Sequence, residues 1–367
     1  MANITVNSGF GFDIRDFDFS EILQAVSYTR STTKFVAQYV MGKEEFGGTN
    51  FTYDGMGAPT GGTVTSHATW HQATRAYLVD GFSIQMTSIW AAVQTTSTSD
   101  DLALIASVLT GADVFKGGNG ADYMKLYGGN DTATGNGGND TIFGGTGNDT
   151  IAGGDGSDKL YGDAGADKLD GGAGTDTAYY AGAKAGVTAS LFNTAINTGD
   201  AQGDTYVSIE RLAGSSHADK LYGNGSANLL AGGSGNDLLN GASGNDTING
   251  GLGADDLWGA AGADTFDFNA LTDTTVALAG RDTIFDFSGS GGDRLDLSTI
   301  DANSGAAGDQ AFTYLGTAAF TGTAGELRYI KQASDTYIYG DVNGDRKVDF
   351  AIHLDDAISL SKGYFIL

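Results

Sequence analysis

Aspartate recurs at nine-residue intervals along much of the chain, and this spacing is its main chemical signal. A first array holds eight aspartates in strict register: Asp113, Asp122, Asp131, Asp140, Asp149, Asp158, Asp167 and Asp176. A second array holds Asp219, Asn228, Asp237, Asp246, Asp255 and Asp264 at the same position. Each follows glycines in the pattern G-G-x-G-x-D-x-U-x, in which U is a large apolar residue. Carboxylates on tight turns are ligands that calcium accepts, so the spacing predicts rows of calcium ligands.

The U positions predict how the repeats fold. They hold Phe115, Met124, Ala133, Ile142, Ile151, Leu160, Leu169 and Ala178 in the first array, and Leu221, Leu230, Leu239, Ile248, Leu257 and Phe266 in the second. Glycine permits the positive φ of a tight turn, and the segment D-x-U-x is long enough only for a short strand. Each nonapeptide is then half a coil, and two of them complete one coil of a parallel β-roll.

Stacked coils sort the aspartates into two rows, because residues two repeats apart share an edge. In the first array one row is Asp113, Asp131, Asp149 and Asp167, and the other is Asp122, Asp140, Asp158 and Asp176. Stacked carboxylates repel one another unless a cation lies between successive turns. Calcium suits this gap better than magnesium, because it accepts about six to eight oxygens with flexible geometry.

Glycine carbonyl oxygens of the turns complete the predicted ligand set. The glycines concerned are Gly117, Gly120, Gly135, Gly138, Gly144, Gly147, Gly153, Gly156, Gly232, Gly235, Gly241, Gly244, Gly250 and Gly253. Without the ion, the U side chains form only a thin core for a glycine-rich chain that loses much entropy on ordering. We therefore expect the arrays to be unfolded without calcium.

Charge and composition exclude several classes of partner. Acidic residues outnumber basic ones by 45 to 19, and the formal net charge is -26. Nucleic acid is excluded as a partner because the polyanion would be repelled. A merely solvated acidic surface is disfavoured, because the acids are mostly Asp and keep fixed intervals. The chain has no cysteine, no apolar run of membrane-spanning length and no N-terminal signal-peptide pattern, so no membrane-spanning segment is expected.

The two arrays resemble the RTX (hemolysin-type) repeats of bacterial proteins exported by type I secretion systems, such as serralysin metalloproteases and repeat-containing toxins. The segments 281–287 and 292–298 resemble the C-terminal domain of serralysins, which caps the roll. The resemblance implies a secreted protein, extracellular or bound to the cell surface, with the type I secretion apparatus as a partner. The repeat pattern departs from that family at Leu126-Tyr127, His217 and Asn228, and weaker calcium sites are implied there.

The expected fold class is mainly β, with a parallel β-roll, a small α+β N-terminal domain and a β-rich C-terminal cap. The expected divisions are an N-terminal domain at 1–107, the first array at 108–179, an insertion at 180–213, the second array at 214–267 and the cap with its export signal at 268–367. The insertion is expected to pack beside the roll or splice into it. Within the N-terminal domain, helices are predicted at 20–28 and 99–109, and strand with turn at 46–67.

Two further segments each have two possible interpretations. The segment 341–349 has the D-x-N-x-D spacing that opens a calcium loop, but Arg346 and Ile352 stand where an EF-hand needs Gly and Glu. An Asx-rich hairpin turn explains this segment equally well. The apolar tail 363–367 resembles the uncleaved export signal of serralysin-like substrates, and it also fits a final β-strand.

The motifs of the enzymes exported with such repeats do not occur in the sequence. The chain has no H-E-x-x-H, no G-x-S-x-G and no cysteine nucleophile. His67 and His71 have the i, i+4 spacing that could bind a transition metal on a helix, but two satisfied or exposed histidines are favoured. Binding to ice is disfavoured, because the third repeat position forms no Thr or Asn ladder.

The sequence thus favours a secreted, non-enzymatic calcium-binding protein. It is expected to fold on binding calcium outside the cell and to act in adhesion or in matrix or surface association, with cell-surface polysaccharide or a second copy of the chain as partner. The alternative is a small hydrolase or polysaccharide-modifying enzyme in residues 1–107, with the roll as its secretion and folding module.

Overall fold

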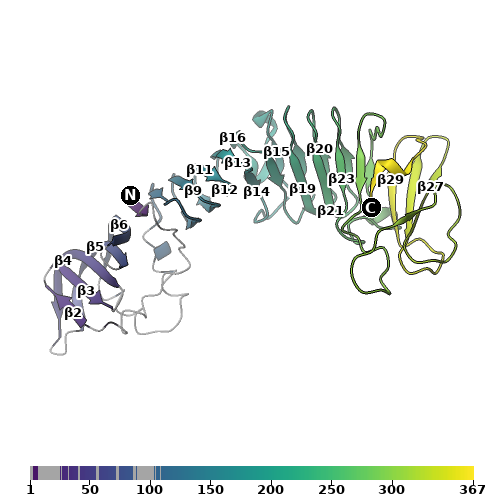
Figure 1. Cartoon of the computed structure of the whole chain (residues 1–367). Coiled ribbons are helices and arrows are strands. Elements are labelled where there is room, and N and C mark those ends of the chain that lie inside the picture. Colours follow the sequence, from purple (N-terminus) through teal and green to yellow (C-terminus); the bar gives the residue numbers. More distant parts are fainter. Residues whose placement is uncertain are drawn as a thin grey trace. The chain divides into compact units, whose positions relative to one another are not determined.

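The computed structural model describes residues 109–367 without a gap, and before them residues 3–6, 25, 27–31, 33–39, 42–54, 58–71, 74–85, 88, 103 and 105–107. The chain forms two compact units, one of Met1–Thr177 with Asp204–Ile209 and the other of Ala178–Gly203 with Glu210–Leu367. Figure 1 shows stacked strands in each unit, and the predicted mainly-β fold with a parallel β-roll is confirmed.

The first unit contains the roll of the first array. One face consists of β7 (Val114–Lys116), β9 (Thr132–Gly137), β11 (Thr150–Gly156), β13 (Lys168–Gly174) and β16 (Thr205–Val207), all parallel. The other face includes β8 (Tyr123–Lys125), β10 (Thr141–Thr146) and β12 (Lys159–Ala164). The short strand β14 (Thr177–Tyr179) begins where this unit ends in sequence. Ile151 pairs with Leu169, eighteen residues on. One coil is therefore two nonapeptides, as predicted.

The second unit is built in the same way. One face carries β15 (Thr188–Ser190), β18 (Lys220–Tyr222), β20 (Leu238–Asn240), β22 (Asp256–Trp258) and β24 (Thr283–Ile284). The other carries β17 (Arg211–Ala213), β19 (Leu229–Ser234), β21 (Thr247–Leu252), β23 (Thr265–Asp267), β25 (Arg294–Asp296) and β30 (Phe365–Ile366). Because β15, β16 and β17 all come from residues 180–213, this insertion splices into the roll.

The core of both rolls is the column of U side chains. Every U residue of both arrays is at most 1% exposed. Strand geometry explains this burial, because side chains alternate and the residue two after each aspartate points to the same side of the strand as the aspartate. Each large apolar side chain so buried contributes about 1.5–3 kcal/mol.

The C-terminal segment extends one face of the roll into a mixed sheet, in which β27 (Glu326–Lys331), β28 (Thr336–Asp341) and β29 (Phe350–Leu354) are antiparallel. Strand β24 pairs with β29, which is followed in the sheet by β28, β27 and β26 (Thr313–Tyr314). The tail forms β30, which pairs with β25. The parallel pairing of β29 with β24 and of β30 with β25 covers the end of a solenoid whose last strands would otherwise stay unpaired. Short 3-10 helices occur at Thr194–Ile196, Gly199–Ala201, Leu278–Gly280 and Lys362–Tyr364.

The described N-terminal residues form an antiparallel sheet. Its strands are β1 (Asn3–Val6), β2 (Ser27–Arg30), β3 (Lys34–Gln38), β4 (Gly42–Tyr53), β5 (Pro59–His71) and β6 (Thr74–Gln85), and β1 also pairs in parallel with β7. The predicted strand and turn at 46–67 corresponds to the β4–β5 hairpin. Within that predicted segment, residues 55–57 lie outside the described residues.

The two predicted N-terminal helices have different outcomes. The prediction at 20–28 is wrong at its end, because Ser27 and Tyr28 begin β2, where the Tyr28 ring packs 5.7 Å from that of Phe35. Residue 25 is described and is not helical, and the other residues of that prediction lie outside the described residues. In the segment 99–109, residues 103, 105 and 106 are helical, and the Ser107 N–H donates to the Ala103 carbonyl at 3.1 Å.

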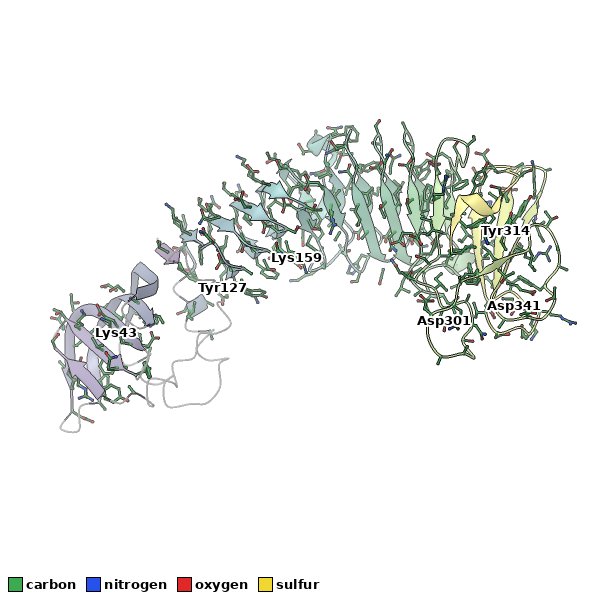
Figure 2. The ribbon with its side chains drawn as sticks, in the orientation of Figure 1. Lys43, Tyr127, Lys159, Asp301, Tyr314 and Asp341 are labelled. Carbon is green, nitrogen blue, oxygen red and sulfur yellow. The ribbon has the colours of Figure 1, made fainter. Side chains whose placement is uncertain are left out.

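The second position of most repeats has a left-handed backbone, in glycine and non-glycine residues alike. Gly154 and Gly233 have φ of 112° and 105° there, and Tyr127, labelled in Figure 2, and Ala242 have φ of 68° and 74°. A left-handed conformation costs a residue with a Cβ about 1–2 kcal/mol. The non-glycine residues that adopt this left-handed conformation therefore carry local strain.

Replacing Ala242 by Gly is expected to raise the unfolding free energy of the calcium-loaded protein by about 0.5–1 kcal/mol, because the relieved strain exceeds the entropy that Gly adds to the unfolded chain. Urea unfolding followed by circular dichroism measures the change. Ala231→Gly, in the ordinary strand β19, is the matched control and should lower stability by a similar amount. Equal destabilisation by both changes would contradict the argument.

Candidate calcium sites

The aspartates of the arrays are buried in two rows. Every one of the thirteen is at most 3% exposed, and Asn228 is 5% exposed. Along each row, the backbone N–H of one aspartate donates to Oδ1 of the aspartate one coil further on. Asp113 donates to Asp131 at 2.7 Å, and Asp122 donates to Asp140 at 2.7 Å. Within each predicted row, successive aspartates are thus linked by hydrogen bonds that use Oδ1 as the acceptor.

The second carboxylate oxygen, Oδ2, is the one available to an ion. It is buried and has no hydrogen-bond partner among the described residues in Asp131, Asp140, Asp149, Asp158, Asp167, Asp237, Asp246, Asp255 and Asp264. None of these carboxylates forms an ion pair with a described Lys, Arg or His. A buried charge without a partner costs several kcal/mol, so the rows fit a bound cation.

The first glycine of each turn faces this oxygen. An ideal Cβ on Gly232 would overlap Oδ2 of Asp237 and lie 2.5 Å from the carbonyl oxygen of Gly250, one coil on. The same overlap with an aspartate Oδ2 occurs at Gly117, Gly135, Gly144, Gly153, Gly241 and Gly250. Glycine at this position therefore keeps open the space on which a carboxylate and a backbone carbonyl converge, and those are the oxygen types that calcium takes.

The glycine at the fourth position of each repeat makes the close stacking of coils possible. Gly138, Gly147, Gly156, Gly235, Gly244 and Gly253 have φ between 108° and 148°. A Cβ on Gly138 would lie 2.5 Å from the carbonyl carbon of Gly120. Direct ligation by the glycine carbonyls stays a prediction, and the geometry assigns the fourth-position glycines a steric role.

A second hydrogen-bond ladder runs beside the aspartates. Asn130 Oδ1 accepts the N–H of Asn148 at 2.9 Å, and Asn148 Oδ1 accepts the N–H of Ala166 at 2.9 Å. These bonds run in the opposite direction to the aspartate ladder, because the side chain accepts from the following coil. Each turn is thereby fixed to both neighbouring coils, which holds the aspartate oxygens in position.

Burial of the rows makes their carboxylates difficult to ionise. Desolvation, followed by the charge of neighbouring carboxylates, raises the pKa of Asp140 and of Asp237 to about 7 and that of Asp167 to about 8. For Asp246, desolvation and the charge of Asp264 raise the pKa to about 7. An ion that neutralises the rows removes this penalty.

Three row members were missed by the sequence reasoning. Asp204, Asp282 and Asp293 extend the rows, because their Oδ1 atoms accept the N–H groups of Asp167, Asp255 and Asp264 at 2.9, 3.0 and 3.0 Å. They stand 37, 27 and 29 residues after those partners instead of 18, and no G-G-x-G precedes them. The only part of the repeat motif that these three aspartates keep is D-x-U, with Tyr206, Ile284 and Leu295 at the U position.

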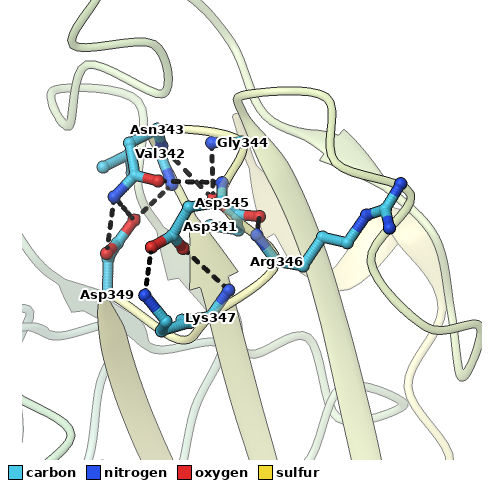
Figure 3. A network of polar contacts seen from close by, with 8 residues as sticks. All are labelled: Asp341, Val342, Asn343, Gly344, Asp345, Arg346, Lys347 and Asp349. Carbon is cyan, nitrogen blue, oxygen red and sulfur yellow. Dashed lines mark hydrogen bonds and ion pairs between the residues drawn. The ribbon is translucent and has the colours of Figure 1, made fainter.

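The loop 341–349 satisfies its own acidic groups, as Figure 3 shows. Asp341 accepts the N–H of Gly344 at 2.7 Å and that of Arg346 at 2.9 Å. Asp349 accepts the N–H of Val342 at 2.8 Å, and Asp345 pairs with Lys347 at 2.8 Å. The loop joins β28 to β29, and these contacts favour the hairpin turn over a calcium loop.

The spacing of His67 and His71 does not make a metal site on a strand. Both lie on β5, where four residues advance the backbone by about 13 Å, whereas on a helix they would advance it by about 6 Å. The His67 ring contacts the Glu44 carboxylate through Nε2 and stacks on Phe46 with centroids 4.5 Å apart. The alternative of a satisfied histidine is therefore favoured for His67.

Comparisons with known proteins agree with this geometry. The family described as peptidase M10 serralysin C terminal matches residues 130–363, and the RTX calcium-binding nonapeptide repeat matches residues 109–142. None of the curated proteins is significantly similar to this chain. Among the described residues, no helix is long and apolar enough to cross a membrane.

The solved structures that are similar to parts of the chain include the following three. The AlgE6R3 subunit of the Azotobacter vinelandii mannuronan C5-epimerase is 28% identical, with 41% of this chain and 78% of that one covered and a TM-score of 0.31. The AlgE6R2 subunit of the same enzyme is 27% identical, with 42% and 91% covered and a TM-score of 0.32. The extracellular lipase LipA of Serratia marcescens is 18% identical, with 70% and 38% covered and a TM-score of 0.24. On its family matches, the chain belongs to the peptidase M10 serralysin C-terminal family and carries calcium-binding RTX repeats.

Proposed function

We propose that this calcium-binding RTX protein is exported unfolded through a type I channel and folds when it meets calcium outside the cell. The observation that carries the proposal is the double row of buried aspartates, nine of which (Asp131, Asp140, Asp149, Asp158, Asp167, Asp237, Asp246, Asp255 and Asp264) have an Oδ2 with no hydrogen-bond partner among the described residues. Low cytosolic calcium leaves these carboxylates charged and mutually repelling, which opposes coil stacking. Extracellular calcium, at about millimolar concentration, neutralises them and couples ion binding to folding.

Calcium titration of the purified full chain tests this proposal. Starting in chelator and rising to about 10 mM calcium, far-UV circular dichroism should show a cooperative gain of β signal. Magnesium at the same concentrations is the matched control and should not reproduce the gain, because it prefers a rigid octahedron and retains water. A β spectrum already complete in chelator and unchanged by calcium would rule out calcium-driven folding.

The proposed role of the folded protein is non-enzymatic adhesion, or association with matrix or the cell surface. Proteins with such export-linked rolls work outside the cell, and the acidic chain would contact polysaccharide or a second copy of itself through calcium-ordered surfaces. Cosedimentation with producer cells and exopolysaccharide, and analytical ultracentrifugation of the protein alone, should show calcium-dependent association. Absence of all three associations, or a chemical change in the polysaccharide, would contradict this role.

A further inference from the structure

A histidine and two aspartates lie close together on the mixed sheet at the C-terminus, apart from the aspartate rows. Nε2 of His353 is 3.1 Å from Oδ1 of Asp335, and one ligand atom from each of Asp335, His353 and Asp355 lies within 4.8 Å of the other two. Asp335 belongs to the turn between β27 and β28, His353 lies on β29, and Asp355 directly follows that strand. Pairing of β28 with β29 therefore brings together three side chains that can bind a metal.

The His353 ring is held in one orientation by its neighbours. Its Nδ1 lies 3.1 Å from Oγ1 of Thr283 on the adjacent strand β24, and its plane stacks on Tyr337 with ring centroids 4.8 Å apart. The backbone is fixed as well, because the His353 N–H donates to the Asp282 carbonyl at 3.1 Å. When Nδ1 carries the proton and donates it to Thr283, the lone pair of Nε2 is free to bind a metal beside Asp335. Metal-binding histidines almost always donate a hydrogen bond from the ring nitrogen away from the ion in this way.

The two carboxylates have no basic side chain to neutralise them. Among the described residues, no Lys or Arg forms an ion pair with Asp335 or Asp355, and the only ion-pair contact of Asp335 is with His353. Carboxylates that lie this close repel each other unless an opposite charge lies between them. A cation bound between the carboxylates and Nε2 of His353 removes this repulsion.

We propose that Asp335, His353 and Asp355 bind a zinc ion. The histidine nitrogen decides the class of metal, because calcium and magnesium take oxygen ligands, whereas zinc binds histidine nitrogen together with aspartate oxygen. Tetrahedral zinc with bonds of about 2.0–2.1 Å places its ligand atoms about 3.3 Å apart, and Nε2 of His353 already lies 3.1 Å from Oδ1 of Asp335. Asp355 is exposed, so its side chain can rotate to supply the third ligand, and water takes the fourth position.

The zinc site is separate from the calcium rows, and it does not depend on the proposed function. None of its three ligands belongs to a row. The ion links the turn between β27 and β28 to the residue that follows β29, and an ion that binds only the folded protein stabilises it by mass action. Zinc is therefore expected to raise the thermal midpoint of the calcium-loaded protein further.

Zinc titration of the full chain by calorimetry tests the proposal, with excess calcium present throughout so that zinc does not occupy the aspartate rows. Asp355→Asn should weaken zinc binding at least about tenfold, because the loss of groups beyond the ligands already costs about 10–100-fold in metal affinity. Asp356→Asn is the matched control, because Asp356 is the next residue, is equally exposed and lies outside the cluster. It should keep the full zinc affinity. Unchanged affinity in Asp355→Asn, or equal losses in both variants, would overturn the proposal.

Nuclear magnetic resonance of the unchanged protein, labelled with nitrogen-15 in its four histidines, identifies the nitrogen that binds zinc. Zinc should shift the Nε2 signal of one ring, and His353→Gln should remove that signal. His217→Gln, which replaces an exposed histidine of the second array, is the matched control and should leave it in place. A zinc-dependent shift that persists in His353→Gln, or zinc binding that shifts no histidine signal, would overturn the inference and leave the proposed function intact.

Discussion

Calcium-free protein is expected to gain β structure when the pH falls from about 8.5 to about 5.5, the range that brackets the raised pKa values of the buried rows. Ordinary folded proteins gain little or lose stability over such a change. Here protons are expected to substitute for calcium, because a protonated aspartate is neutral and no longer repels the next carboxylate in its row.

The sign follows from which state binds more protons. Desolvation raises the pKa of Asp131 to about 6, of Asp140 to about 7 and of Asp167 to about 8 in the folded, ion-free form, whereas aspartates of an unfolded chain titrate at about 3.9. Between these values the folded form holds more protons than the unfolded one, so the stability that protonation contributes is fully present at low pH and is lost as the pH rises through the raised values.

Calcium should reverse this dependence, which supplies the control. Protons and calcium compete for the same carboxylates, so in saturating calcium the protein should become less stable as the pH falls over the same range. Circular dichroism at a series of pH values, in chelator and in calcium, measures both slopes. Slopes of the same sign in the two buffers would show that the aspartate rows do not control folding. Glu45 and Glu326, whose pKa values are lowered, contribute the ordinary slope only at more acidic pH.

The roll could be predicted from the sequence because each nine-residue repeat contains both the residues that form the local turn and the residues that pair with, and pack against, the neighbouring coils. In the repeat containing Asp158 and Leu160, the glycine turn, the buried aspartate and the buried apolar residue all recur in register with the preceding coil. Fixing the period therefore fixes the strand pairing, the burial and the rows together. The Asn ladder that runs in the opposite direction was not foreseen, since its hydrogen bonds depend on which coil precedes and which follows.

The missed row members show where this reasoning ends. Asp204, Asp282 and Asp293 are brought into the rows by tertiary pairing of β16, β24 and β25, and loops of other lengths replace the glycine turn. A short D-x-U motif is too common to predict a site by itself. In the N-terminal region, residues 27 and 28 were assigned to a helix from local pattern, but pairing with β3 decided their conformation. Sequence periodicity carried no information there.

Replacing Gly253 by Ala is expected to lower the unfolding free energy of the calcium-loaded protein by about 3 kcal/mol or more, among the largest effects of a single methyl group in this chain. Gly253 has φ of 148°, and an ideal Cβ would overlap the carbonyl oxygen of Gly235 and lie 2.6 Å from its carbonyl carbon. Both atoms are backbone of the neighbouring coil, so no side chain can move aside. Urea unfolding in calcium, followed by circular dichroism, measures the loss.

The matched control is Gly225→Ala, in the same array, where an added Cβ meets no atom within 4 Å and φ is not left-handed. That change should be neutral or slightly stabilising, because Ala restricts the unfolded chain. The contrast separates close coil stacking from any general intolerance of the glycine turns to substitution. Since the ions are proposed to bind between stacked coils, Gly253→Ala should also need more calcium to fold than Gly225→Ala does. Equal calcium midpoints for the two variants would mean that coil spacing and ion binding are independent, and the link between the fourth-position glycine and the calcium rows would fail.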